Sequence, residues 1–194
     1  VRPVRPPAEM PSRTLVSNRE FRSFVDDGGY QRPELWSFGG RKWLETEQDV
    51  SLVHGLDEPL MRAPRHPLYW RWHENRWEER LFDQWQPLNP DAPVAHVTYW
   101  EAEAWCNWAG RRLPTEYEWE VAALANRPGE TFRRFPWGNE APSVAHADMD
   151  GRNQALNPVW DYAAGESPFG CRQMIGSVWE WTSNQFLPYD GFKV

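Results

Sequence analysis

The stretch from Gly110 to Ala123, GRRLPTEYEWEVAA, constrains the local fold more tightly than any other part of the chain. Pro114 lacks an N–H and disfavours the α conformation at the residue before it, so a preceding helix must end there. Thr115 can then act as the N-cap of a new helix, and Glu118 follows three residues later, where a capping box needs it. The pattern predicts a helix that begins at Thr115 and ends near Ala125.

Three carboxylates in this stretch could also be acid–base groups. Glu116 and Glu118 lie in the first turn, where negative charge complements the positive end of the helix dipole. Capping therefore explains both, and neither they nor Glu120 is assigned a catalytic role. Apolar residues at helical spacing predict the buried stripe of this helix: Trp119, Ala122 and Ala123.

Two further Ser/Thr-x-x-Glu patterns predict two further helices. The first pairs Ser17 with Glu20, and a glycine stop follows at Gly28. The second pairs Thr98 with Glu101, and its helix is expected to end between Asn107 and Gly110. The expected apolar faces are Phe21, Phe24 and Val25 in the first helix, and Trp100, Ala104 and Trp108, with Trp105 beside them, in the second.

The rest of the chain predicts irregular backbone held by large aromatic side chains. The sequence has 14 Trp and 18 Pro in 194 residues, and few aliphatic runs. Residues 31–58 suggest a hairpin or loop around Gly39-Gly40, and residues 59–95 suggest short strands and long loops, with a polar strand or exposed turn at 76–80. Short strands are also expected at 14–16 and 93–97, and residues 178–181 alternate, with Val178 and Glu180 on one face and Trp179 and Trp181 on the other. Residues 1–13, with four prolines and three arginines, predict a linker.

Charge and hydropathy exclude several classes of protein. The net charge is −7, so a nucleic-acid-binding surface is not expected. No apolar run approaches the length that spans a membrane. The two cysteines, Cys106 and Cys171, predict free thiols in a reducing compartment, and hence a cytoplasmic location.

Motifs for the common catalytic and metal sites are absent. The sequence has no phosphate loop and no GxSxG nucleophile elbow. His54 and Glu58 are four residues apart but lie in a loop-forming segment, and His96 is expected to pack in a buried strand. Cys106 is expected in the core, whereas Arg172 beside Cys171 would favour a thiolate there. A hard cation would find oxygen ligands in the Asp148/Asp150 loop, or at Glu180 with backbone carbonyls of residues 173–178.

Several motifs together resemble the formylglycine-generating enzyme/sulfatase-modifying-factor family. They run in that family's order as LVSNREF at 15–21, PVAHVT at 93–98 with AWCNWAG at 104–110, RLPTEYEWE at 112–120, PWG at 136–138 and GSVWEWT at 176–182. The resemblance implies an α+β, C-type-lectin-related fold with little regular secondary structure, over residues 14–194. It also implies structural roles for Arg112, Thr115, Glu116, Glu118, Trp119, Glu120, Trp179 and Trp181.

Within this family, the segments GGY at 28–30, PELW at 33–36, PLYW at 67–70 and those following Gln173 are most similar to one branch. That branch comprises the non-haem iron sulfoxide synthases of ergothioneine and ovothiol synthesis and the related selenoneine synthases. The resemblance implies a thiol or selenol and trimethylhistidine as substrates. It also implies iron(II) held by three histidines of an upstream DinB-like helical domain, to which the residue 1–13 linker would connect.

The same resemblance places the reactive tyrosine beyond Val194, so the domain is expected to be incomplete at its C-terminus and inactive alone. Tyr189 is expected to be structural. Two calcium sites are implied in part, one at Asp148 and Met149 and one at Gly176, Val178 and Glu180, although Gln173 replaces an Asn of the second. Two alternatives remain open: a formylglycine-generating oxidase, and a non-catalytic binding domain on the same scaffold.

Overall fold

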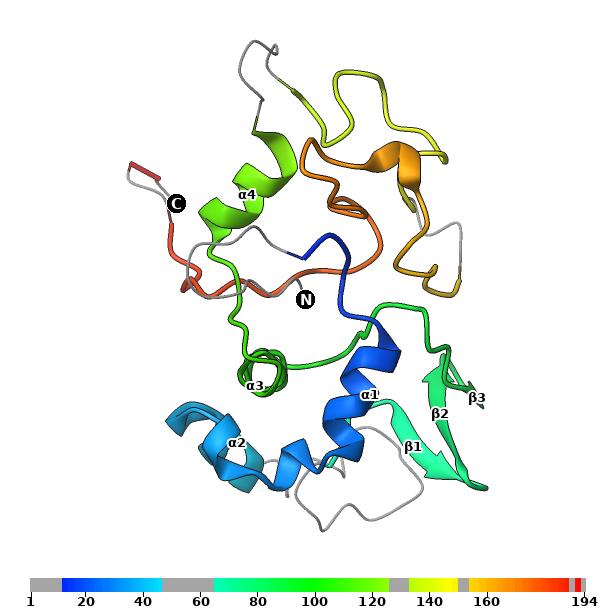
Figure 1. Ribbon diagram of the computed structural model, residues 1–194, viewed down its shortest axis with the longest axis vertical. Helices are drawn as coiled ribbons and strands as arrows, with labels where there is room; N and C mark the ends of the chain where they lie inside the picture. The colour runs from blue at the N-terminus through cyan, green and yellow to red at the C-terminus, as the bar shows by residue number, and fades with distance from the viewer. Residues whose placement is uncertain (1–11, 47–64, 126–132, 150–153, 189–190, 193–194) are drawn as a thin grey trace.

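A computed structural model describes residues 12–46, 65–125, 133–149, 154–188 and 191–192 (Figure 1). Most of the expected linker, His54, Glu58, Asp150 and Tyr189 lie outside these ranges. The fold is α+β, with much irregular backbone between short elements. In chain order the elements are α1 (Asn18–Asp26), η1 (Gly29–Gln31), η2 (Pro33–Leu35), α2 (Phe38–Thr46), β1 (Trp70–His73), β2 (Arg76–Leu81), β3 (Gln84–Pro87), α3 (Tyr99–Trp108), α4 (Glu116–Leu124) and η4 (Ala163–Gly165).

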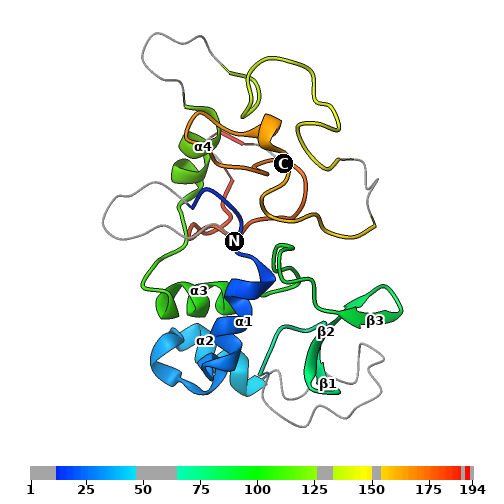
Figure 2. The ribbon, with the colours of Figure 1, turned by 45° about the vertical axis from the view of Figure 1, so that its right-hand side comes forward.

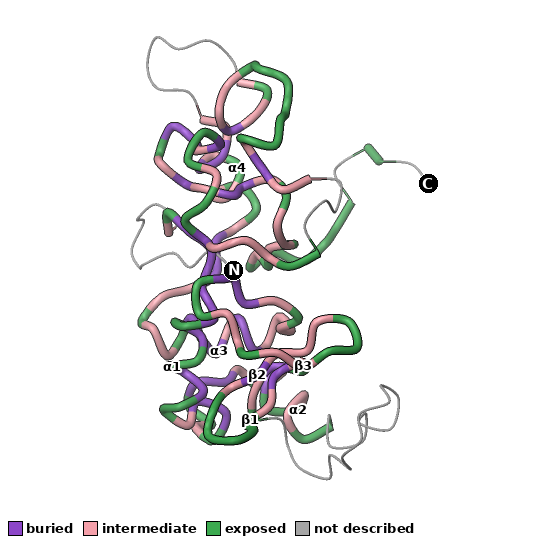
Figure 3. The backbone as a smooth tube through the Cα atoms, turned by 90° about the vertical axis from the view of Figure 1, so that its right-hand side faces the viewer, coloured by how far each residue is buried: buried purple, intermediate pink, exposed green. Residues whose placement is uncertain are grey.

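The elements form two halves (Figures 1 and 2). Helices α1, α2 and α3 and the small sheet surround the larger core, whose buried rings include Phe21, Phe24 and Trp36. Helix α4 packs against the irregular segment that follows it, over a smaller core of Ala122, Ala123, Cys171 and Met174. Buried backbone runs through both halves (Figure 3).

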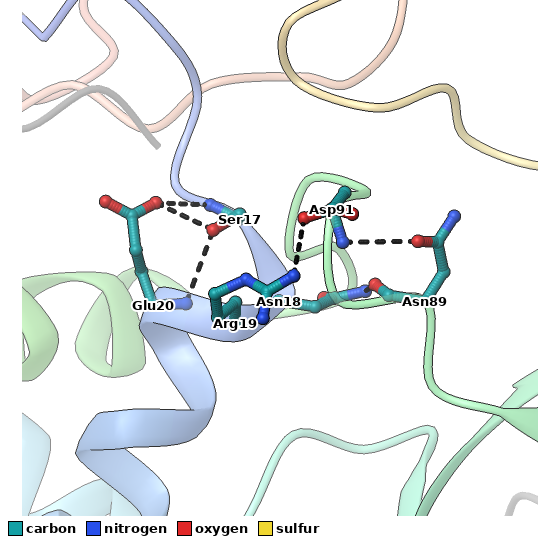
Figure 4. Close-up of polar contacts among 6 residues, drawn as sticks. All are labelled: Ser17, Asn18, Arg19, Glu20, Asn89 and Asp91. Atoms are coloured by element: carbon teal, nitrogen blue, oxygen red, sulfur yellow. Dashed lines mark hydrogen bonds and ion pairs between the residues drawn. The ribbon is translucent and has the colours of Figure 1, made fainter.

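All three predicted capping boxes are present. In each, the hydroxyl of the N-cap residue accepts a hydrogen bond from the backbone N–H of the Glu three residues later. The side chain of that Glu in turn accepts a hydrogen bond from the backbone N–H of the N-cap residue. At α1 the Ser17 N to Glu20 Oε2 distance is 2.9 Å and the Glu20 N to Ser17 Oγ distance is 3.3 Å (Figure 4). Because this motif depends only on residues three apart, the sequence locates the helix starts correctly.

The buried faces of these helices are only partly as predicted. Helix α1 buries its expected positions, Phe21, Phe24 and Val25. Helix α3 buries Ala104 as expected, but Trp105 is buried while Trp100 and Trp108 are half-buried. The reason is that α3 contacts α1, α2, η1 and η2, so more than one of its faces is covered.

The expected hairpin or loop around Gly39-Gly40 is wrong, because this segment forms helix α2. The glycines serve close packing here. A Cβ built on Gly39 would lie 2.4 Å from the ring of Trp100. Trp36, just before α2, stacks on Trp43 with 5.9 Å between ring centroids.

The described strands form one antiparallel sheet in the order β1-β2-β3. Glu74 and Asn75, the two residues of the first hairpin turn, have φ of 47° and 61°. Positive φ at both positions is the mark of a type I′ turn, which suits the twist of the strands. Residues 76–80, expected as a polar strand or an exposed turn, lie in strand β2.

The other predicted strands do not form. Residues 14–16 and 93–97 are joined by one bridge, Ser17 with Pro93, and by the Val94 N to Val16 O bond of 2.9 Å. Residues 178–181 join no ladder, yet they keep the expected alternation, with Trp179 and Trp181 exposed and Val178 and Glu180 half-buried. An apolar alternation alone does not supply the partner strand that a ladder requires.

Candidate functional site

The RLPTEYEWE stretch at the start of α4 is built around Glu118, which bonds to two other residues of the same stretch. Arg112 donates from Nη1 to Oε2 at 2.7 Å and from Nη2 to Oε1 at 2.6 Å. The Thr115 N–H donates to Oε2 at 2.8 Å. These Arg112 bonds, ahead of the bonds from Thr115, lower the pKa of Glu118 to about 2. The carboxylate is therefore ionised and fixed at neutral pH, as a structural anchor requires.

The segment that carries the GSVWEWT pattern docks on the start of α4. The Glu116 N–H donates to Asn184 Oδ1 at 2.7 Å, and the Ser183 N–H donates to the Pro114 carbonyl at 2.8 Å. Trp181 donates from its indole to the Val97 carbonyl at 3.0 Å. Three stretches distant in sequence, near Val97, Pro114 and Ser183, thus meet at one place.

The motif residues themselves fall into two environments. Trp119 is half-buried against the smaller core, and Trp181 is anchored by its indole although 44% of it is exposed. Glu120 is exposed, and Trp179 is fully exposed at 101%. Trp179 therefore contributes little to the core, and its surroundings are open to solvent.

Two loops that were expected to bind calcium lie against each other. Gly176 has a φ of 82°, and a Cβ built there would lie 2.1 Å from the carbonyl oxygen of Asp148. The Asp148 carboxylate accepts a bond from Asn157 Nδ2 at 2.9 Å. Nearby, the buried Gln173 amide donates to the Pro158 carbonyl at 2.7 Å and accepts from the Ser177 hydroxyl at 2.5 Å.

No group of three His, Cys, Asp or Glu side chains able to hold a metal ion occurs within the ranges that the structure describes. His96 is exposed with a φ of 57°, and its ring meets that of Tyr69 edge-on at 4.8 Å. The expected buried strand position of His96 is thus wrong, because residues 93–97 do not form a strand. His66 is partly covered, and burial lowers its pKa.

Both cysteines are buried and neither forms a disulfide. Burial raises the pKa of Cys106 to about 12, so its thiol stays protonated in the core as predicted. Cys171 is 1% exposed, and Arg172 bonds to Glu166 Oε1 at 2.5 Å and to the Trp160 carbonyl. Burial of Cys171 leaves little access for the reactive thiolate that its neighbour in sequence suggested.

Sequence patterns did not reveal one buried polar pair, Tyr30 with Glu101. The Tyr30 hydroxyl donates to Glu101 Oε1 at 2.5 Å, and both residues are buried. Burial first, and then the charge and hydrogen bond of Glu101, raise the pKa of Tyr30 well above its usual value. The pair ties the GGY segment to the capping box of α3, so it explains why a tyrosine follows the two glycines.

Three large exposed apolar side chains lie within or shortly after the GSVWEWT pattern. Trp179, Phe186 and Leu187 are 101%, 106% and 67% exposed. We call these three residues the C-terminal apolar strip.

Helices long and apolar enough to cross a membrane are not found in the described part of the chain.

Known proteins match this chain over nearly its whole length. The family model "Sulfatase-modifying factor enzyme 1-like domain" matches residues 9–193. The chain is 42% identical over 180 residues to the hercynine oxygenase of Mycolicibacterium smegmatis, and 38% identical over 186 residues to that of Mycobacterium tuberculosis. These alignments cover 93% and 96% of the chain, but only 38% and 40% of the relatives.

The formylglycine-generating enzyme of Bos taurus is 34% identical over 184 residues, which cover 87% of the chain and 46% of that relative. The chain thus spans about two fifths of the hercynine oxygenases and about half of the formylglycine-generating enzyme. The family match extends over residues 9–193, which include the segments that meet at the start of α4. The chain therefore belongs to the sulfatase-modifying factor enzyme 1-like domain family.

Proposed function

We propose that this domain is part of an oxygenase that joins a thiol, or a selenol, to the imidazole ring of hercynine, which is trimethylhistidine. The observation that carries the proposal is the difference in identity between two groups of relatives. Three hercynine oxygenases are 38–42% identical over 93–96% of the chain, whereas the formylglycine-generating enzymes and their inactive paralogues are 29–34% identical.

With a thiol, the proposed reaction balances with O₂ as the only oxidant. A C–S bond replaces an imidazole C–H bond, one oxygen atom oxidises the sulfur to a sulfoxide, and the other leaves as water. Iron(II) would supply the activation of O₂. The described residues do not fit an iron site, since His96 packs on Tyr69 and His146 stacks on Trp137 at 4.7 Å, each in a different part of the fold.

In this proposal the iron lies in another part of a longer protein, in an upstream DinB-like helical domain, and residues 1–13 link it to a family domain at 14–194. The reactive tyrosine lies after Val194, so the domain is incomplete there. The C-terminal apolar strip supports a surface that other parts of the protein or the substrate cover, because large exposed apolar patches mark interaction sites. Relation to C-type lectins and a cytoplasmic location belong to the same proposal.

The test is an assay of the longer protein, loaded with iron(II), with hercynine, O₂ and either γ-glutamylcysteine or cysteine. Mass spectrometry should detect the sulfoxide, and the 194-residue chain alone should give none. A formylglycine product on a cysteine-containing sulfatase peptide, with no sulfoxide, would instead assign the protein to the formylglycine-generating enzymes. Absence of both products would favour a non-catalytic binding domain.

Calcium binding is a separate proposal for the two touching loops, with Asp148 and Met149 on one and Gly176, Val178 and Glu180 on the other. It is supported by their contact and by the oxygen donors that such loops offer. We expect Ca²⁺ to raise the melting temperature relative to a sample in chelator, and Asp148→Asn to reduce that rise. Equal melting temperatures with Ca²⁺ and with chelator would reject the site.

A further inference from the structure

A pocket of about 280 Å³ lies between helix α1 and the hairpin of β1 and β2, which are neighbours in Figures 1 and 2. Trp77 bridges the two elements by donating from its indole to Asp26 Oδ1 at 3.0 Å. The pocket is formed by residues of the larger half, and one of them, Arg19, belongs to the LVSNREF segment at 15–21.

Three arginines line this pocket, and no acidic residue does. They are Arg19 and Arg22 from α1 and Arg76 from β2, beside the Asn75 turn residue. The whole chain carries a net charge of −7, so this lining is opposite in sign to the average surface. A local cluster of guanidinium groups on an acidic protein favours an anion over a cation.

Carboxylates outside the lining hold each guanidinium in place. Arg19 bonds through one N–H to Asp91 at 2.9 Å (Figure 4), and Arg22 bonds through one N–H to Asp26 at 2.9 Å. Arg76 uses two N–H groups on Glu78, at 3.0 and 2.8 Å. Each guanidinium carries five N–H donors, so these contacts orient the arginines while using a minority of their donors.

The same carboxylates offset much of the positive charge. Recognition of an anion here therefore depends on directed N–H groups, which a planar carboxylate matches well. Because Asp91 and Asp26 are about half-exposed, we expect the contribution of the charges on Arg19 and Arg22 to weaken with added salt, whereas Glu78, the partner of Arg76, is buried.

The remaining walls are aromatic and apolar. Trp72 is 55% exposed, and its ring meets that of Trp77 at 5.5 Å and 72°, so one indole presents surface to solvent beside the arginines. Pro87, Leu88 and Pro90 complete the lining. An exposed indole next to a proline-rich wall offers contact for a flat ring.

From these features we propose that the pocket binds a small aromatic carboxylate, with its carboxylate on the arginines and its ring beside Trp72. The volume of about 280 Å³ lies just below the range of about 300–1,000 Å³ for ligand sites, which suits an acid of about amino-acid size. A free acid and the C-terminal residue of a peptide share this chemistry, and competition distinguishes them.

The test is a calorimetric titration of the intact chain with 2-naphthoate, with the neutral 2-naphthamide as the matched ligand. We expect saturable binding of the acid at one site, and at least about tenfold weaker binding of the amide. Arg22→Gln should weaken naphthoate binding about tenfold, and Trp72→Ala about fivefold. Raising the salt concentration should weaken binding of the acid and leave the amide unchanged.

The control variants are Arg41→Gln, an exposed arginine on α2, and Trp160→Ala, a tryptophan 61% exposed in the other half. Both should bind naphthoate like the unmodified chain, and circular dichroism should show all variants folded. No saturable binding, equal affinity for acid and amide, or an equal loss in the controls would each overturn the proposal. The competition experiment uses a peptide that ends in Trp, with a free or an amidated C-terminus. Displacement of naphthoate by the free form alone would show that the pocket binds the C-terminus of a protein.

Discussion

Glu118 joins two kinds of stabilisation in one side chain, since it caps α4 and accepts the paired bonds of Arg112. Each role needs the ionised form. A group whose pKa is lower in the folded state stabilises the fold above its unfolded pKa and loses that effect as the pH falls through its folded pKa. For Glu118 this window extends from about 4.5 down to about 2.

We therefore expect Glu118→Gln to lower the free energy of unfolding by about 1–2 kcal/mol at pH 7, a figure reduced for partial exposure. The difference from the unmodified chain should persist down to about pH 4.5 and shrink towards pH 2. Urea unfolding at a series of pH values measures it. Glu120→Gln, on an exposed carboxylate of the same helix, serves as the matched control. A constant difference for Glu118→Gln would contradict the assignment.

Tyr30 makes the opposite prediction at alkaline pH. Its pKa is raised in the folded protein, so the unfolded chain ionises first and stability falls as the pH rises above about 10. Tyr30→Phe should cost about 1–3 kcal/mol at pH 7, because Glu101 loses a buried donor, and should make the alkaline fall shallower. Tyr117→Phe, on an exposed tyrosine, serves as the control. Equal alkaline slopes for Tyr30→Phe and the unmodified chain would argue against this account.

The contrast between these two residues shows what sequence can predict at this scale. The Thr115–Glu118 capping box joins residues three positions apart and is visible as a pattern. The Tyr30–Glu101 bond joins residues 71 positions apart, and no local rule pairs them. Glu101 was correctly predicted as a capping residue, a role that its Oε2 atom fulfils. The bond that its Oε1 atom accepts from Tyr30 and the burial of its side chain depend on tertiary packing.

At the level of elements, helix α2 was missed because Gly39-Gly40 indicated a turn. Glycine lowers helix propensity, but here it allows the Trp100 ring to approach the backbone. We expect Gly39→Ala to destabilise the fold by about 1–3 kcal/mol, since its Cβ would clash with that ring. In a Trp100→Ala background the same change should be neutral or stabilising by up to about 1 kcal/mol. Urea unfolding of the four proteins gives the coupling, and additive effects would exclude the contact.

The contact between the two candidate calcium loops can be tested with a matched pair of glycines. Gly176 and Gly191 have φ of 82° and 86°, so alanine strains the backbone at both. Only Gly176 faces a close neighbour, the Asp148 carbonyl, whereas nothing lies within 4 Å of a Cβ at Gly191. Gly176→Ala should therefore cost about 1–3 kcal/mol more than Gly191→Ala in thermal or urea unfolding. Similar losses would show that the loops are not held together there.

Strands were the least predictable elements. Residues 76–80 alternate weakly but pair on both sides and form β2, whereas residues 178–181 alternate clearly and join no strand ladder among the described residues. Strand formation depends on a partner supplied by the rest of the fold, and one-dimensional patterns do not contain that information. Helix starts carry their own partners, which is why three of them were placed correctly.

Across the whole molecule, the sequence predicted more of the two cores than of the surfaces that several elements form together. Family motifs supply the rings and caps of both, and they predicted the family and the α+β class. The arginine-lined pocket combines residues of α1, β1, β2 and the segments around them, and of its lining only Arg19 belongs to a quoted family motif. Surfaces built from several elements thus depend on the folded arrangement, even where each element was predicted.

The C-terminal apolar strip leads to a prediction about association. Trp179, Phe186 and Leu187 are far more exposed than side chains of their size usually are, and apolar area of this kind associates to leave water. We expect the 194-residue chain to self-associate as its concentration rises, as measured by analytical ultracentrifugation. Replacing all three residues by Ser should shift it towards monomer with little loss of stability, because none is buried.

The matched control replaces exposed apolar residues elsewhere. Tyr117→Ser and Val144→Ser change side chains that are 73% and 65% exposed but lie outside the strip, so self-association should persist in that double variant. A monomer at all concentrations, or equal loss of association in both variants, would show that the strip does not attract other copies. In the longer protein proposed above, the strip is covered by other parts of that protein. The three serine replacements should therefore weaken the packing between the strip and those parts and lower the melting temperature of the longer protein. The melting temperature of the isolated domain should be unaffected.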